Sequence, residues 1–475
     1  ALPAIDGSIL TGITASGTGA IGGLTIKNQS GSVVGTAGSI ATIDFNGSTG
    51  TTVTATSGAS GIATVVISGG FSQDDQGNLI AGTGAGAAAD SDTCFNIMLG
   101  CNTGAALNSG DFNVLIGGCN TGKAITSGCA NILLGNNAGC TLDSGNKNII
   151  IGEYAGRGMT SAINNIAIGS RAQLCTTGGH NIALGLGALQ NGTSINDSIG
   201  IGRYVLRYVS GDCNIAMGMC AGSGDSGGSS GTFNVMIGRY AGKGFTSGTA
   251  NIILGKNAGR NVTTGGSNIA LGCYAMTAGT VTGSKNIAIG ERAGCSLTSA
   301  SQNILIGNAV GRQIQTSGDN ILIGRAIAQE NCTPCANIVM GLEAGYNMGS
   351  ACYNVILGTQ AGCNISSGEK NVFIGYQSAG KCAVTGDENI VIGRNVAQRL
   401  TSGSDNVFIG RYAASQSNWT GNCNIVMGYS ALSDAGSSNS TVAIGRYAAG
   451  NIAGGSCNVI IGNDAGCGDT GMTAT

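Results

Sequence analysis

The chain has 475 residues, including 87 Gly and 2 Pro, and only 9% of its residues are charged. Gly at this level without a Gly-X-Y period excludes collagen, and the lack of any run of 18 consecutive apolar residues argues against a membrane-spanning helix. The formal net charge is −2 and there is no basic run, so the composition does not predict a nucleic-acid-binding protein.

Residues 1–93 lack the internal repeat that fills the rest of the chain. Between Leu24 and Ile67, short runs rich in Val, Ile and Thr alternate with turn-forming clusters. This pattern predicts a small all-β domain of hairpins over residues 1–70. Residues 71–93 are rich in Gly, Ala and Asp and are interpreted as an adaptor segment.

A repeat of about 17 residues begins at Asn96 and recurs in 22 copies, for example Asn148-Ile-Ile-Ile-Gly152. With the Asn as position zero, position one is always Ile or Val, position three is Ile, Leu or Met, and position four is always Gly. A short fixed period indicates a repeat architecture, and 17 residues hold one coil with two short strands and tight corners. We therefore predict an all-β fold, a parallel β-solenoid of about 22 coils over residues 94–468. The tail 469–475 has no cap signature, so a further domain is expected after it.

Side chains alternate across a strand, so positions one and three share one face and position two takes the other. We expect positions one and three, such as Ile149 and Ile151, to point into the coil. Ala at position seven and apolar residues at position eleven, such as Met159, are expected to close the core. Position two would then face outward although it is apolar or Gly in every copy, which predicts burial against other chains. The residues expected to face a trimer axis are Leu115, Ile150, Ile253, Leu305, Phe373, Phe408 and Ile460.

Asn at position zero and Gly at position four have structural explanations. Stacked Asn side chains can satisfy one another's amides in a ladder along the coils. The Gly is expected in the turn that ends each strand. The predicted ladder includes Asn96, Asn113, Asn131, Asn148, Asn165, Asn181, Asn214 and Asn251. The predicted turn glycines include Gly100, Gly117, Gly135 and Gly152.

Charged residues concentrate at positions five and six, as in Glu153 and Arg203, and are interpreted as a solvated edge or, alternatively, a glycan-contacting stripe. The 18 Cys occupy positions that hold other small residues in other copies, so we expect most of them to be free thiols. Cys332 and Cys335 form an isolated C-x-x-C, which alone is weak evidence for a metal site. Cys335 and Cys352 share a column in neighbouring coils, where a disulfide could form.

The sequence predicts no catalytic residue, no metal ligand set and no cofactor. His180 is the only His, which removes most His-based catalytic triads and metal sites. Carboxylates are few and scattered, so a glycosidase pair formed between different coils is the remaining enzymatic alternative. The chain is accordingly expected not to be an enzyme.

Two resemblances rest on the repeat. The unit Asn-Ile-Ala-Ile-Gly at Asn165 and Asn286 resembles the repeat of trimeric autotransporter adhesin heads, which are parallel β-rolls that trimerise through an apolar face. Ile5-Asp-Gly-Ser-Ile-Leu-Thr-Gly-Ile-Thr-Ala-Ser-Gly17, together with the Asn-x-x-Ile-Gly units, is similar to tail-fibre proteins of tailed phages, especially those of marine cyanobacteria. The second resemblance covers nearly all of the chain.

These resemblances imply a homotrimeric fibre shaft of a phage virion that extends toward or binds the host cell surface. A bacterial surface adhesin of the autotransporter type is the alternative, and a glycan-cleaving tailspike is the third possibility. The implied partners are further copies of the chain, other virion proteins, and a host surface glycan or protein. The implied location is the virion or, for the alternative, the bacterial cell surface.

Overall fold

The architecture is that of a computed structural model. It describes residues 73–467 except 225–226, 278, 331, 451 and 453–454, and before residue 73 only the backbone of five strands. The chain divides into two compact units, Ala1–Asp75 and Gln76–Thr475. The predicted tail 469–475 lies outside the described residues.

The first unit contains short antiparallel strands, in keeping with the hairpins predicted there. Strand β1 pairs with β2, and β4 pairs with both β3 and β5. The strands are β1 (Thr25–Lys27), β2 (Val33–Thr36), β3 (Ile43–Asp44), β4 (Thr52–Ser57) and β5 (Ala63–Ser68).

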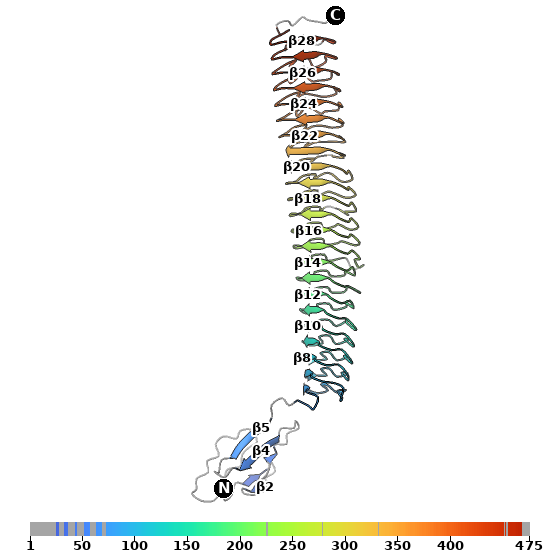
Figure 1. The fold of residues 1–475 in the computed structure, drawn as a ribbon, viewed down its shortest axis with the longest axis vertical. Helices are drawn as coiled ribbons and strands as arrows, with labels where there is room; N and C mark the ends of the chain where they lie inside the picture. The colour runs from blue at the N-terminus through green and yellow to red at the C-terminus, as the bar shows by residue number, and fades with distance from the viewer. Residues whose placement is uncertain are drawn as a thin grey trace, which may run out of the picture. The chain divides into compact units, whose positions relative to one another are not determined.

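The second unit is a parallel β-solenoid, which confirms the fold class predicted from the repeat. Its strands stack in chain order along one side of a column, and the described residues contain no helix (Figure 1). Neighbouring strands pair residue for residue, so that Ile149 is opposite Ile166 and Ile150 is opposite Ala167. The 23 strands are β6 (Leu79–Ala81), β7 (Ile97–Cys101), β8 (Val114–Cys119), β9 (Ile132–Leu134), β10 (Ile149–Ile151), β11 (Ile166–Ile168), β12 (Ile182–Leu184), β13 (Ile199–Ile201), β14 (Ile215–Met217), β15 (Val235–Ile237), β16 (Ile252–Leu254), β17 (Ile269–Leu271), β18 (Ile287–Ile289), β19 (Ile304–Ile306), β20 (Ile321–Arg325), β21 (Ile338–Leu342), β22 (Val355–Leu357), β23 (Val372–Ile374), β24 (Ile390–Ile392), β25 (Val407–Ile409), β26 (Ile425–Met427), β27 (Val442–Ile444) and β28 (Val459–Ile461).

Each coil contains one such strand, whereas two per coil were expected. The opposite side of the coil is built from turns, and a second line of pairing survives there only as isolated bridges such as Leu400 with Trp419. Turns suit that side because the repeat leaves too few residues for a second extended run after the corners. The 20-residue step in the repeat does not disturb the sheet, since Ile215 still pairs with Val235.

The predicted adaptor over residues 71–93 is wrong for most of its length, because the solenoid begins earlier. Strand β6 pairs in parallel with β7, with Leu79 opposite Ile97. Asn78 occupies position zero of this first coil and accepts a hydrogen bond from the backbone N–H of Asn96 at 2.8 Å. Residues 78–95 are therefore a first coil of the solenoid, which has Leu79 in place of Ile or Val at position one.

The corners of the coil depend on left-handed backbone conformations at fixed positions. The residue before the Asn and the residue at position six both have positive φ, as in Lys147 (57°) and Tyr154 (57°). The turn glycine Gly152 has φ 131°, a region that residues with a Cβ rarely adopt. A Cβ on Gly152 would also lie 2.7 Å from the backbone of Gly169 in the next coil. Close stacking of the coils thus explains why Gly recurs at position four.

The core contains position two, together with positions seven and eleven. In the coil that starts at Asn148, Ile150, Ala155 and Met159 are all fully buried. Positions seven and eleven are therefore placed as predicted. Ile149 and Ile151 are only half-buried and lie on the outer surface of the sheet. The prediction that these two point into the coil is wrong.

The residues predicted to face a trimer axis instead point into the core, so that prediction is also wrong. Six of them lie inside the solenoid with at most 1% of their surface exposed, and Ile460 in the last strand is half-buried against the core. The reason is the parity of the strand. The Asn at position zero is buried, and position two shares its face because side chains two residues apart point the same way. The residues corrected are Leu115, Ile150, Ile253, Leu305, Phe373, Phe408 and Ile460.

Candidate functional site

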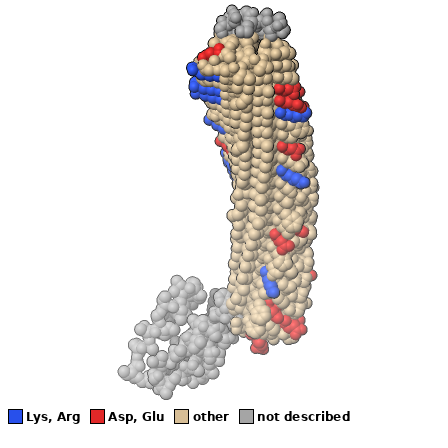
Figure 2. Space-filling view, turned by 45° about the horizontal axis from the view of Figure 1, so that its top comes forward, with Lys and Arg blue, Asp and Glu red and all other residues tan. Residues whose placement is uncertain are grey.

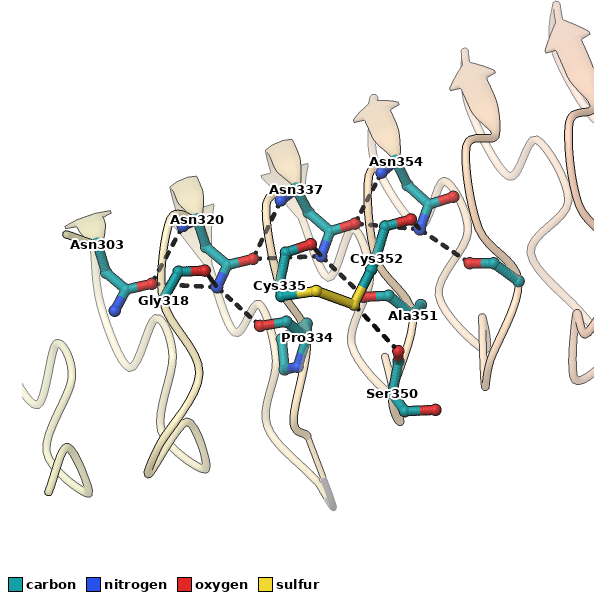
Figure 3. The surroundings of a disulfide bond; sticks show 11 residues. Asn303, Gly318, Asn320, Pro334, Cys335, Asn337, Ser350, Ala351, Cys352 and Asn354 are labelled. Atoms are coloured by element: carbon teal, nitrogen blue, oxygen red, sulfur yellow. Dashed lines mark hydrogen bonds between the residues drawn. A yellow bond between two sulfur atoms is a disulfide. The ribbon is translucent and has the colours of Figure 1, made fainter. Parts of the chain in front are cut away.

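The Asn residues at position zero form a buried column of hydrogen bonds along the solenoid, and Figure 3 shows the part from Asn303 to Asn354. The backbone N–H and side-chain Nδ2 of Asn337 both donate to Oδ1 of Asn320, at 3.1 and 3.2 Å. The same Nδ2 donates to the carbonyl of Ala351 at 2.8 Å. Each Asn thus ties its own strand to the preceding coil and to the far corner of its own coil. The predicted ladder residues take part in this column at Asn96, Asn113, Asn131, Asn148, Asn165, Asn181, Asn214 and Asn251.

The two copies without Asn keep part of this bonding. Ser198 replaces the amide with a hydroxyl that accepts from the backbone N–H of Asn214 at 3.1 Å and donates to the carbonyl of Asn196 at 3.1 Å. Thr441 donates to the carbonyl of Asn439 at 3.3 Å. A hydroxyl at position zero therefore retains some of the hydrogen bonds. The hydrogen bonds of the ladder are enough to explain why Asn recurs at this position, and no bound ligand is needed.

We predict that Asn320→Ala destabilises the solenoid by about 3–5 kcal/mol, because it leaves several buried groups unpaired at about 1–3 kcal/mol each. These include the carbonyl of Pro334, which accepts from Asn320 at 2.8 Å, and the amide of Asn337. Asn320→Ser is the matched control and should cost clearly less, as the hydroxyl at Ser198 indicates. Denaturant unfolding followed by circular dichroism compares the two. Equal losses for Ala and Ser would contradict the assigned role of the ladder.

The outward face of the sheet is apolar throughout its length. The first and third residues of all 23 strands are Ile, Val, Leu or Met, apart from Ala81. None of them is buried, whereas the second residue is buried in every strand from β7 to β27. We call this surface the outer sheet face. It was not identified from the sequence, because its residues were assigned to the core.

The outer sheet face is large for a surface exposed to water. Ile252 is 41% exposed and Met340 is 42% exposed. A side chain of this size presents roughly 100 Å² of apolar surface when fully open, by the usual conversion from transfer free energies. Of the 46 side chains in the two columns, thirteen are 37–71% exposed and the others are partly exposed, which leaves on the order of 1,000 Å² uncovered. The largest apolar patch on a typical monomer is about 300–600 Å², so this face has the character of an interface.

Charged side chains border the outer sheet face on both sides. On the face of the column that Figure 2 shows, charged side chains lie along the left and right margins, and the band between them is uncharged. One margin is the residue before each Asn, and the other is position five after the turn Gly. Among the described residues there is one ion pair, Lys370 with Glu388 at 3.1 Å, and this contact raises the pKa of Lys370.

Several Arg residues at position five or nearby contact Tyr rings. Arg411 lies 4.9 Å from the ring centroid of Tyr412, and Arg207 lies 4.6 Å from that of Tyr208. The hydrogen bond from Arg411 lowers the pKa of the Tyr412 hydroxyl. Arg411 is exposed at position five, whereas Arg207 is at position nine and is half-buried.

One cross-coil disulfide joins Cys335 and Cys352, at the place where the sequence allowed one (Figure 3). Cys332, the other half of the C-x-x-C, is buried, and burial raises the pKa of its thiol. Of the other fifteen Cys, eleven are half-buried and four are exposed. The C-x-x-C thus supplies one half of a bridge and one buried thiol.

Groups that could hold a metal do not gather in the described part of the chain, where no three His, Cys, Asp or Glu come together. A shallow hollow between neighbouring coils is lined by Tyr274, Arg292, Cys295, Arg312 and a few uncharged polar residues, with no carboxylate or His. No helix among the described residues has the length and apolar character needed to cross a membrane.

No protein-family model, curated protein or solved structure matches this chain.

Proposed function

We propose that the chain is the shaft of a fibre on a tailed-phage virion, in which three copies associate and extend toward or bind the host cell surface. The observation that carries this proposal is the outer sheet face, which is apolar along all 23 strands. A single chain would leave this face in water, and further copies of the same chain would cover it. Three-fold symmetry is proposed because of the resemblance to phage tail fibres and trimeric adhesin heads.

Because position two lies in the core, the proposed interface consists of positions one and three, which are apolar as well. Chains would meet through the first and third residues of each strand, such as Ile252 and Leu254. A closed cyclic arrangement suits a long uniform stripe, because each coil then meets its own copies at the same height. At about 4.8 Å per coil, 23 coils give a shaft of roughly 110 Å.

The proposed role is mechanical and adhesive, without catalysis. A regular column with one repeated coil supplies length and stiffness, since each coil contacts only its neighbours and the Asn column joins them all. The charged margins remain available for contacts with other virion proteins or with a host surface glycan. No nucleic acid or membrane lipid is proposed as a partner.

Sedimentation of the purified full chain, combined with electron microscopy, tests the proposal. The expected species has three times the chain mass and is a rod whose repeat region is about 110 Å long. Antibodies against the chain should label the tails of intact virions. A monomer in solution would contradict the proposed association, and labelling of bacterial cells without virions would favour the adhesin alternative.

A further inference from the structure

Two columns of residues border the outer sheet face, and their charges are related coil by coil. The first column is the residue directly before position zero, which is Asn in all but two copies, and the second is position five, directly after the turn Gly. Six coils carry a charge in both columns, and in all six the two charges have opposite sign. All twelve side chains are exposed. The six pairs are Lys147 and Glu153, Asp197 and Arg203, Lys285 and Glu291, Asp319 and Arg325, Glu388 and Arg394, and Asp405 and Arg411.

The matching of signs does not follow from one acidic margin and one basic margin. In four coils the acid precedes the strand, as at Asp319, and in two coils the base precedes it, as at Lys147 and Lys285. When the first column changes sign, the second column of the same coil changes with it. The relation therefore concerns pairs of residues at one height along the column.

None of the six pairs forms an ion pair within the described part of one chain. The two residues flank the same strand and are separated by up to about 20 Å at ~3.3 Å per residue. The ion pair that does form links different coils, through Lys370 and Glu388. Within one chain, moreover, Arg394 and Arg411 lie in neighbouring coils of one column, where like charges oppose each other.

We infer that copies of this chain cover the outer sheet face in parallel and in register, so that the residue before each Asn in one copy pairs with position five of the same coil in the next copy. This inference rests on the self-association proposed above and specifies its geometry. Rotation about an axis parallel to the column keeps every coil at its own height and brings opposite margins together. A face-to-face antiparallel pair would instead bring identical margins together, and the six pairs would be lost.

The charged pairs can fix the register between two copies, which the apolar face alone cannot. A stripe of repeated Ile and Val fits a copy of itself equally well after a shift of one coil, so it cannot fix the register. The six pairs are unevenly spaced along the column. A shift of two coils sets Lys285 against Arg325, and a shift of three coils sets Lys147 against Arg203. Like charges that face each other in this way disfavour the wrong alignments. The charged columns therefore contribute to the specificity of the register more than to the affinity.

Zero-length carbodiimide cross-linking of the full chain tests the register. Lys147 should link to Glu153, and Lys285 to Glu291, in bands that contain two or more chains, because the distance within one chain is too long. The 3.1 Å pair Lys370–Glu388 is the internal control and should also link in the single-chain band. If the control link forms in an oligomer but Lys147 links only to acids of other coils, or to none, the inference is overturned. A monomer in sedimentation would instead refute the self-association itself.

A charge exchange provides a second, independent test. Asp319→Arg should weaken self-association at least roughly tenfold, because it places like charges at one height in every interface. Adding Arg325→Asp restores opposite charges in that coil and should restore association. Combining Asp319→Arg with Arg394→Asp gives the same net charge with the exchange in different coils, and it should not restore association. Equal behaviour of the two double variants would overturn the inference.

Discussion

Ile253→Asp is expected to prevent the coils around it from folding, whereas Ile252→Asp is expected to leave the solenoid folded and to disrupt self-association. Ile253 is 1% exposed and Ile252, the adjacent residue of β16, is 41% exposed. Losing a buried Ile costs about 2–5 kcal/mol, and burying a carboxyl group without a partner adds several more. At Ile252 the carboxylate remains in water in the single chain, but association would bury it against its own copies at the same height.

Circular dichroism and sedimentation separate these two effects. Ile253→Asp should lose the β signal or aggregate, and Ile252→Asp should keep the signal and sediment as a smaller species. Lys256→Asp is the control, because Lys256 is exposed and the residue before Asn251 is Ala250, so no paired charge is reversed. It should match the unmodified chain in both measurements. A folded Ile253→Asp variant beside an unfolded Ile252→Asp variant would show that the strand faces the opposite way.

The repeat alone was sufficient to predict the fold class and the column of Asn, because both depend on spacing. The period of 17 residues sets one coil, and residues at the same position in successive copies must then stack. Which face of a three-residue strand points inward is a different question, since both faces are apolar here. The restriction to Ile or Val at position one and to Ile, Leu or Met at position three favours a core on that face, whereas the interior position is the one that varies from Gly200 to Phe373.

That variation is a signal that the sequence contained. An interior position changes size together with its neighbours, and a Cβ on Gly200 would lie 2.2 Å from a methyl group of Leu189 in the preceding coil. The buried Asn at position zero also indicates that position two points inward, because side chains two residues apart lie on the same face of a strand. The first coil was missed for a related reason. Asn78 and Gly82 fit the repeat, but Leu79 and Ala81 depart from it at positions one and three.

The paired charges were also present in the sequence but had no meaning before the faces were assigned. From the sequence, position five is interpreted as a solvated edge or a glycan-contacting stripe, and neither interpretation relates it to the residue before the Asn. Because the outer sheet face lies between these two columns, Asp405 and Arg411 stand at the two margins of the proposed interface. In the proposed assembly, each of these residues pairs with the other residue of the same coil in a second copy of the chain.

Gly255→Ala is expected to destabilise the solenoid by about 4 kcal/mol or more, although it adds a single methyl group. Gly255 has φ 135°, where a residue with a Cβ is strained by about 1–3 kcal/mol. The added Cβ would also lie 2.5 Å from the carbonyl oxygen of Gly272 in the next coil. That oxygen belongs to the backbone and is fixed by the stack, so the coils must separate to make room. Separation would weaken the hydrogen bonds on both sides, including that from Asn268 to Asn251 at 2.9 Å.

Gly227→Ala is the matched control for this change. A Cβ on Gly227 meets no atom within 4 Å, so its stability should remain within about 0.5 kcal/mol of the unmodified chain. Thermal unfolding compares the two variants, and hydrogen exchange locates the effect, which should centre on β16 and β17 because each coil contacts only its neighbours. Loss of protection spread evenly over the column would mean that the coils unfold as one unit. Unchanged stability of Gly255→Ala would mean that the coils stack less closely than the column of glycines requires.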